Sequence, residues 1–231
     1  MTEQATVFVV DDDEAARESL RWLLESVGHR VRCHASAREF LAAWDRAAPG
    51  CLVLDVRMPG MSGMELQEHL KTEEGCLPVI IVTGHGDIPM AVRAMRGGAV
   101  DFLQKPYNDQ IMLDRIQQAL DLCRQRRREH LRQARIQAAY QHLTPREAEV
   151  AARVVLGKAN KVIAIEMGLS HKTVEAHRAN VMEKMRAGSL SELVRMFVRL
   201  GLVSDEESLG EAAHGVWPDD RYGRKYGTRT G

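Results

Sequence analysis

The first 120 residues alternate between short apolar runs and longer stretches in which apolar side chains recur every three or four positions. Short runs rich in β-branched residues predict strands, and the longer periodic stretches predict amphipathic helices. The predicted strands cover residues 6–10, 30–34, 51–55, 78–83 and 100–103, and the predicted helices cover residues 14–27, 36–44, 62–72, 88–96 and 108–120. This alternation predicts an α/β fold, a doubly wound five-stranded parallel sheet with helices on both faces.

Polar side chains follow the apolar runs at four of the predicted strand ends. In the order of the strands, they are Asp11 and Asp12, then Asp55, Thr83 and Lys105. Because a β–α repeat places the carboxyl end of every strand at the same edge of the sheet, we expect these side chains to converge. Taken alone, Asp55 is explained equally well as an ordinary turn residue, Thr83 as a strand end and Lys105 as a solvated side chain. Their occurrence together favours a functional site.

The residue types at these strand ends point to phosphoryl chemistry. Neighbouring carboxylates repel each other and raise one another's pKa. A divalent cation removes that repulsion, and Mg²⁺ prefers a few carboxylates together with water and phosphate oxygens. With Mg²⁺ bound, Asp55 can stay ionised and attack a phosphorus atom. Lys105 and the Thr83 hydroxyl can then hold the transferred phosphoryl oxygens.

The second half of the chain predicts an all-α domain of four helices. Thr144 and Glu147 have the spacing of a capping box at the start of the first helix, and we expect Asn160 to cap the second and Ser170 the third. The predicted helices cover residues 145–156, 161–167 and 171–185, and the last runs from 189 or 191 to 200. A helix, a tight glycine turn and a second helix are typical of a helix-turn-helix.

The third of these helices has an apolar face and a face of small and polar side chains. The predicted core positions are Val174, Val181, Met182 and Met185, with His177 at their border. The opposite face carries Lys172, Thr173, Glu175, Ala176, Ala179 and Asn180. Its alanines leave room for a DNA major groove and can contact thymine methyl groups. Side chains suited to phosphate contacts are Lys172, Thr173 and Arg178. Glu175 either accepts a hydrogen bond from a cytosine amino group or is solvated. The alternative for the whole face is a helix that binds another protein.

The charge distribution separates the two halves. The chain has 231 residues and no net charge, yet residues 1–124 carry −6, residues 125–203 carry +8 and residues 204–231 carry −2. An acidic module joined to a basic one makes nucleic acid a candidate partner of the second. No apolar run approaches the ~20 residues that span a membrane, and the four cysteines have no paired spacing. We therefore expect a cytoplasmic protein with reduced thiols and no membrane partner.

Two segments lie outside the predicted domains. Residues 123–142 are rich in arginine and lack a sustained heptad, which favours a solvated helical linker. A helix that pairs subunits or contacts DNA phosphates is the alternative. Residues 204–231 lack periodicity and predict a disordered tail, with a partner-binding role of Trp217 as the alternative.

Segments 9–13, 54–60, 83–87 and 101–106 resemble the motifs of the receiver domain of bacterial response regulators, and the resemblance extends over residues 5–122. It implies that Asp55 accepts a phosphoryl group from a sensor histidine kinase. The implied Mg²⁺ ligands are Asp12, Asp55 and the Arg57 carbonyl, with Asp11 bound through water. The implied phosphate-binding and switch residues are Thr83, Phe102 and Lys105, with a cis bond before Pro106 and with Arg57 and His85 tuning the phosphate lifetime.

Segments 144–150, 160–161 and 173–180 resemble the LuxR-type DNA-binding domain, which we place at residues 143–203. Together with the receiver, the chain looks most similar to the FixJ branch of the NarL/FixJ family, although Val162 replaces an acidic residue common there. The resemblance implies that Asn160 and Lys161 join the helix face described above in contacting promoter DNA. It also implies a homodimer formed on phosphorylation through helix 88–97 and strand 100–104, with RNA polymerase as a further candidate partner.

These features predict a DNA-binding transcriptional response regulator of a two-component system rather than an enzyme, beyond phosphoryl transfer and slow self-dephosphorylation. One alternative is a Mg²⁺-dependent aspartyl phosphatase or phosphotransfer enzyme. The Asp-x-Asp arrangement of haloacid-dehalogenase-like hydrolases is absent around Asp55. The other alternative is a regulator that binds DNA independently of phosphorylation, against which the complete acidic cluster argues.

Overall fold

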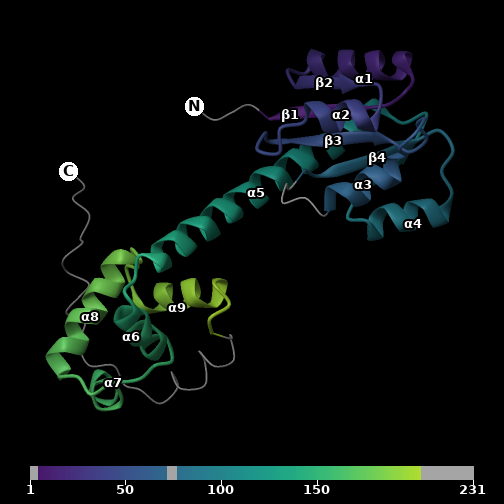
Figure 1. Cartoon of the computed structure of the whole chain (residues 1–231). Coiled ribbons are helices and arrows are strands. Elements are labelled where there is room, and N and C mark those ends of the chain that lie inside the picture. Colours follow the sequence, from purple (N-terminus) through teal and green to yellow (C-terminus); the bar gives the residue numbers. More distant parts are fainter. Residues whose placement is uncertain (1–4, 72–76, 204–231) are drawn as a thin grey trace, which may run out of the picture. The chain divides into compact units, whose positions relative to one another are not determined.

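The computed structural model describes residues 5–71 and 77–203, which form two compact units that divide between His130 and Leu131 (Figure 1). Strands and helices alternate in the predicted order in the first unit. They are β1 (Thr6–Val10), α1 (Glu14–Ser26), β2 (Arg30–His34), α2 (Ala37–Ala43), β3 (Gly50–Asp55), α3 (Gly63–Lys71), β4 (Val79–Thr83), α4 (Ile88–Arg96), β5 (Asp101–Gln104) and α5 (Asp109–Gln141).

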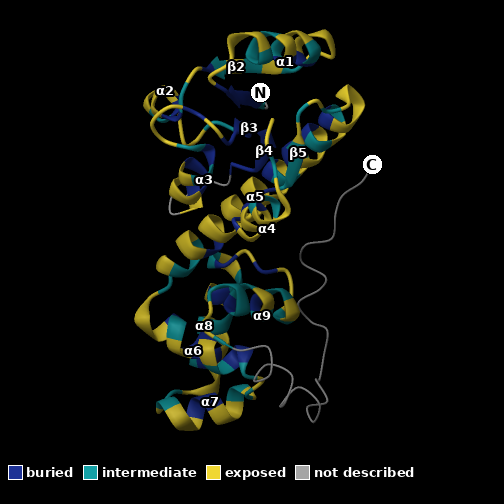
Figure 2. Ribbon diagram, turned by 90° about the vertical axis from the view of Figure 1, so that its right-hand side faces the viewer, coloured by how far each residue is buried: buried dark blue, intermediate teal, exposed yellow. Residues whose placement is uncertain are grey.

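The described strands form one parallel five-stranded sheet in the order β2-β1-β3-β4-β5. Strands β1, β3 and β4 are buried along their whole length (Figure 2), as their continuous apolar runs predict. Helices α1 and α5 pack on one face of the sheet, and α2, α3 and α4 pack on the other. The predicted doubly wound sheet is therefore confirmed.

Helix α5 joins the predicted helix 108–120 and the predicted helical linker 123–142 into one helix. It does not end near Leu120 but continues through the arginine-rich stretch to Gln141. Met112 and Ile116 in its first half are fully buried in the core of the first unit, and Ile136 near its end is buried in the core of the second. The stretch between Cys123 and Ile136 has no buried residue, and it contains no glycine or proline that would end the helix.

The second unit continues with four helices in the described part of the chain. They are α6 (Pro145–Val155), α7 (Asn160–Met167), α8 (His171–Lys184) and α9 (Leu190–Arg199). Side-chain caps at Thr144, Ser170 and Ser189 are confirmed, and Ser189 settles the start of the last helix. The predicted cap at Asn160 is wrong, because Ala159 is the N-cap of α7 and Asn160 is already its first helical residue. Gly168, in the left-handed region with φ +65°, ends α7 and makes the turn to α8.

The described part of the chain contains three of the four cysteines. Cys33 is half-buried, Cys51 and Cys123 are buried, and all three are free thiols. Cys76 and the predicted tail lie outside the described residues. In the part of the chain that the structure describes, no helix combines the length and the apolar character needed to cross a membrane.

Glu147 ties the start of α6 to the end of α8. Its carboxylate accepts the Thr144 backbone N–H at 2.8 Å and the Lys184 ammonium at 2.6 Å, and its side chain is only 4% exposed. Burial alone would raise the pKa of Glu147, but the hydrogen bonds from Lys184 and Thr144 lower it to about 2. The ionised carboxylate therefore stabilises the folded second unit.

Replacing Glu147 by glutamine should lower the stability of α6 by about 2 kcal/mol, because the charged hydrogen bonds are lost while the size is kept. A lowered folded-state pKa makes this contribution complete above the ordinary value of 4.5 and removes it as the pH falls through about 2. Hydrogen exchange of α6 between pH 6 and about 2, corrected for intrinsic rates, measures the difference. Glu149→Gln on the exposed side of the same helix is the control and should change little. Equal effects of the two substitutions at pH 6 would contradict this role of Glu147.

Candidate functional site

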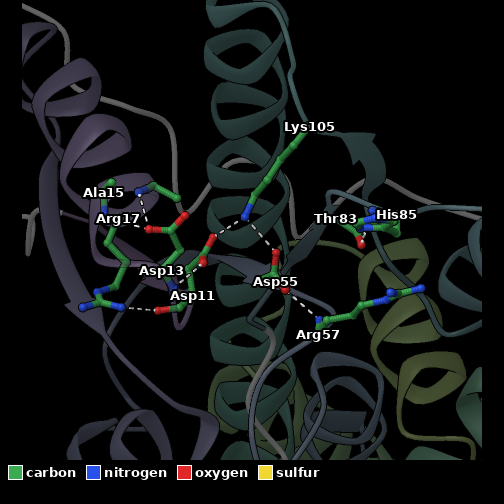
Figure 3. A network of polar contacts seen from close by, with 10 residues as sticks. Asp11, Asp13, Ala15, Arg17, Asp55, Arg57, Thr83, His85 and Lys105 are labelled. Atoms are coloured by element: carbon green, nitrogen blue, oxygen red, sulfur yellow. Dashed lines mark hydrogen bonds and ion pairs between the residues drawn. The ribbon is translucent and has the colours of Figure 1, made fainter.

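Three of the polar side chains predicted at the strand ends, Asp11, Asp55 and Lys105, meet at the carboxyl edge of the sheet (Figure 3). Lys105, which follows β5, lies between Asp11 after β1 and Asp55 at the end of β3. Its ammonium donates to Asp11 Oδ2 at 2.6 Å and to Asp55 Oδ1 at 2.8 Å. The strand order, with β1 beside β3, brings together two carboxylates that are 44 positions apart in the sequence.

Asp55 is held on both carboxylate oxygens. Besides the Lys105 contact on Oδ1, its Oδ2 accepts the Arg57 backbone N–H at 2.6 Å, and its side chain is 8% exposed. Gly63, at the start of α3, packs directly behind it, and a Cβ at this position would lie 2.1 Å from the Asp55 carbonyl oxygen. Only glycine allows this approach, so α3 fixes the strand end from which the carboxylate projects.

The charges at this edge are unbalanced. Burial raises the pKa of Asp11, an effect that the hydrogen bond from Lys105 opposes. Burial lowers the pKa of Lys105, but hydrogen bonds to Asp11 and Asp55 outweigh it and raise that pKa above its usual value. Lys105 is therefore a permanent cation at neutral pH. Lys105 contacts Asp11 and Asp55, and Asp12 follows Asp11 in the chain, so the acidic side chains at this edge outnumber the ammonium and leave an excess of negative charge.

A divalent cation fits this excess charge. Among the described residues, no group of three or more His, Cys, Asp or Glu side chains is arranged to enclose a metal ion. Mg²⁺ does not need such an enclosure, since it keeps several waters and binds through one or two carboxylates. Asp12 is exposed and lines a cavity of about 680 Å³ that also reaches Arg57. The remaining lining residues are Val56, Met58, Pro59, Ser62, Met64, Glu65 and Arg93.

Thr83 and Phe102 lie near each other behind the loop that precedes α4. Thr83 is 1% exposed, and its hydroxyl oxygen accepts the His85 backbone N–H at 3.3 Å, which leaves the hydroxyl hydrogen available to a further acceptor. The half-buried Phe102 ring packs on Gly86, where a Cβ would lie 2.8 Å from the ring. The Lys105–Pro106 peptide bond is cis, as the resemblance implies.

Two residues that support this edge were missed from the sequence. Arg17 on α1 donates to the Asp11 carbonyl oxygen at 2.6 Å. Asp13 caps α1 by accepting from the backbone N–H groups of Ala15 and Ala16. The position of Asp13 just before a helix is a capping signal that the sequence offers. Nothing in the sequence marks Arg17, because its contact depends on how α1 packs on the sheet.

Helix α8 in the second unit presents the predicted DNA-binding face. Val174, Val181 and Met185 are buried, and Met182 and His177 are half-buried, as predicted. On the other side Lys172, Glu175, Ala176, Ala179 and Asn180 are exposed, and Lys161 on α7 is exposed as well. The exposed alanines thus lie between polar side chains on a surface that a major groove can accept.

Other predicted contact residues are engaged within the protein. Thr173 shares a hydrogen bond with the Ser170 hydroxyl at 2.7 Å, and Glu175 lies 3.6 Å from a ring nitrogen of His171. Arg178 is half-buried and donates to the Asn160 side-chain oxygen at 3.0 Å, which joins α8 to α7. The structure therefore brings Asn160 and Arg178 together, a pairing that the sequence did not predict.

Known protein families match both halves of the chain. The response regulator receiver domain matches residues 7–117, and the luxR family of bacterial regulatory proteins matches residues 141–197. A receiver joined to a LuxR-type helix-turn-helix defines a two-component response regulator that acts on transcription.

Relatives that match nearly the whole chain show to which branch of the response regulators it belongs. The transcriptional regulatory protein FixJ of Bradyrhizobium diazoefficiens is 43% identical over 205 residues, which cover 89% of this chain and 100% of that protein. The response regulator protein TodT of Pseudomonas putida is 44% identical over 201 residues, 87% of this chain and 88% of that protein. The chain belongs to the FixJ-like branch of the NarL/FixJ response regulators.

Solved structures agree with this assignment. The structure of the response regulator StyR superimposes with a TM-score of 0.77 at 45% identity, over 85% of this chain and 99% of that one. Full-length FixJ from B. japonicum superimposes with a TM-score of 0.53 at 43% identity, over 87% of this chain and all of that one. The chain is therefore a DNA-binding transcriptional regulator of the two-component type.

Proposed function

We propose that Asp55 accepts a phosphoryl group from a sensor histidine kinase and that this event switches promoter binding by the LuxR-type domain. The observation that carries the proposal is the contact of Lys105 with both Asp11 and Asp55 at the carboxyl edge of the sheet. This contact places a cation beside the nucleophile and beside the acidic cluster that would hold Mg²⁺. The cognate kinase is expected to supply the phosphoryl group as a phosphohistidine.

In the proposed transfer, a carboxylate oxygen of Asp55 forms a bond to phosphorus while the bond from phosphorus to the donor's histidine nitrogen breaks. Mg²⁺ would be held by Asp12, Asp55 and the Arg57 carbonyl, with Asp11 acting through water, and when bound it neutralises charge on the phosphoryl oxygens. Lys105 is placed to contact the same oxygens. Since the Arg57 backbone N–H already holds Asp55, the nucleophile needs little reorganisation.

The response of Thr83 and Phe102 forms the second part of the proposal. The buried Thr83 hydroxyl has its hydrogen available for a phosphoryl oxygen, and its movement would vacate space beside the Phe102 ring. The ring is only half-buried and packs on Gly86, which carries no side chain that would hold it. Turning of the ring inward would then change the surface of α4 and β5.

Mapping the acyl phosphate tests this function directly. Full-length protein incubated with acetyl phosphate and Mg²⁺, trapped with borohydride and digested, should show the modification on the peptide that contains Asp55. Removal of Mg²⁺ with a chelator should reduce the incorporation to background, because the acidic cluster then lacks its counterion. Incorporation at another residue, or incorporation that the chelator leaves unchanged, would refute the proposed acceptor site.

The homodimer is proposed to form through α4 and β5. Ile88, Val92 and Met95 are 81%, 44% and 47% exposed, and their spacing of four and three residues places them on one side of α4. Of the residues on this helix, only Ala94 is buried. An apolar stripe of this kind favours a self-complementary contact with a second copy of the chain.

Replacing Val92 by glutamate should weaken dimerisation of the beryllofluoride-activated protein by about a hundredfold. In a two-fold symmetric dimer both subunits place the new glutamate in the interface, so its unfavourable effect on the binding free energy occurs twice. Sedimentation velocity over a range of concentrations measures the dissociation constant. Trp22→Glu provides the control, since Trp22 is 72% exposed on α1, and this variant should dimerise normally. A Val92→Glu protein that dimerises as the wild type does would exclude this surface.

A further inference from the structure

Asn160 does not perform the role that its type and position suggest. Asparagine before a helix commonly caps it, yet Ala159 is the N-cap of α7 and no side chain caps this helix end. The Asn160 side chain instead accepts a hydrogen bond from a guanidinium nitrogen of Arg178 at 3.0 Å. Since arginine has only donors, the amide oxygen rather than the amide nitrogen must face it.

Arg178 lies on the side of α8 that packs against the rest of the unit. It is four residues after Val174 and three before Val181, and both valines are buried, at 0% and 1% exposure. Arg178 itself is half-buried. A guanidinium that is partly removed from water needs acceptors in fixed positions. Asn160 supplies one of them across the contact between α7 and α8.

We propose that Asn160 is a positioning residue for DNA binding, one that orients the Arg178 guanidinium toward a backbone phosphate without contacting DNA itself. This inference rests on the proposed function, promoter binding by the LuxR-type domain, and on the phosphate contact that the sequence predicts for Arg178. The planar guanidinium carries its N–H donors in a rigid fork whose spacing matches two phosphate oxygens. Fixing the fork before binding removes the loss of side-chain freedom that a mobile arginine would undergo on DNA.

A double-mutant cycle separates this role from a direct DNA contact. Beryllofluoride-activated full-length protein first enriches a duplex from a random-sequence library, and binding to that duplex is then measured by fluorescence anisotropy. The cycle contains the wild type, Asn160→Ala, Arg178→Ala and the double variant. Lys161→Ala, alone and combined with Arg178→Ala, is the matched reference, because the exposed Lys161 is the neighbour of Asn160 and is proposed to contact DNA directly.

If Asn160 acts through Arg178, the Asn160→Ala variant should bind about tenfold more weakly, as expected for a lost hydrogen bond to a charged group. In the Arg178→Ala background the same substitution should change binding less than twofold, because the residue through which it acts is gone. Lys161→Ala should by contrast weaken binding by the same factor in both backgrounds. A general folding defect of Asn160→Ala would weaken DNA binding by the same factor in the wild-type and Arg178→Ala backgrounds, which distinguishes it from the proposed role.

The salt dependence gives an independent readout. Each lost phosphate contact reduces the slope of log K against log salt by about 0.9, or about 1.8 for a dimer with two equivalent sites. Asn160→Ala should reduce the slope in the same sense as Arg178→Ala, although it removes no charge. A direct contact by the neutral asparagine would leave the slope unchanged.

Each other outcome overturns a defined part of the account. Additive losses, or wild-type affinity of Asn160→Ala, overturn the positioning role and leave the proposed function intact. Wild-type affinity of Arg178→Ala overturns the Arg178 phosphate contact and with it the role of Asn160. Failure of the activated wild-type protein to enrich any duplex overturns the proposed function itself.

Discussion

Replacing Asp55 by asparagine is expected to abolish the response of promoter binding to a phosphodonor and to reduce phosphoryl incorporation about a thousandfold, as for the loss of a covalent nucleophile. The amide has nearly the same shape but does not attack phosphorus. It also removes one of the two carboxylates that Lys105 contacts. Radiolabelled acetyl phosphate and anisotropy on an enriched duplex measure the two effects.

Asp13→Asn is the matched control for this substitution. Asp13 lies two residues from Asp11 but caps α1, and asparagine serves equally well as an N-cap. This variant should accept phosphate and bind DNA as the wild type does. Basal DNA binding should persist in Asp55→Asn, because near-complete switching needs about 5.5 kcal/mol of differential stabilisation and a partial switch leaves some active protein. An Asp55→Asn protein that still responds to the phosphodonor would show that the acceptor lies elsewhere.

The fold of the first unit was predictable because each local signal agrees with the others. The run before Asp55 is apolar without alternation, which indicates a strand covered on both faces, and β3 is buried along its whole length. Its end is marked by Pro59 and Gly60 a few residues later. The repeat of such strands with amphipathic helices leaves essentially one topology, and that topology alone determines that Asp11, Asp55 and Lys105 meet.

The contacts within the site were less predictable, because they depend on packing between elements. The sequence indicates that Lys105 reaches the acidic edge but not that it bridges Asp11 and Asp55. The sequence gives no signal that Gly63 and Gly86 are needed for packing, although a Cβ at either position would lie closer than van der Waals contact to a neighbouring group. The predicted roles of the metal ligands, the switch pair and the DNA-contacting residues stay predictions that the variants above test.

Helix α5 joins two segments that the sequence predicts separately. The pattern fades after Leu120 because the helix leaves one core before its end enters another at Ile136. The sequence predicts a packed helix to Leu120 and a separate helical linker over residues 123–142, and the structure joins the two because nothing interrupts the backbone hydrogen bonds between them. The absence of glycine and proline from residues 109–141 was the better guide.

Replacing Ala179 by glutamate is expected to abolish DNA binding, with an affinity at least about a hundredfold lower in both the basal and the activated state. Ala179 is exposed on α8 beside Ala176 and Asn180, so the new side chain would project from the face proposed to enter the major groove. It would fill the space that the alanine leaves and place a negative charge near base edges and phosphates, where an unpaired like charge is strongly unfavourable. Anisotropy on the enriched duplex measures the loss.

Ala152→Glu provides the comparison, because Ala152 is an exposed alanine on α6 of the same unit and away from the α8 face. This variant should bind DNA within about twofold of the wild type, since it changes the net charge by the same amount without entering the interface. Ala179→Glu should still accept phosphate at Asp55, whereas Asp55→Asn should retain basal binding. The two variants therefore separate the switch from the surface that it controls. If Ala179→Glu and Ala152→Glu bound equally well, α8 would not be the helix that reads the promoter, and the DNA-binding surface would have to lie on another face of the second unit.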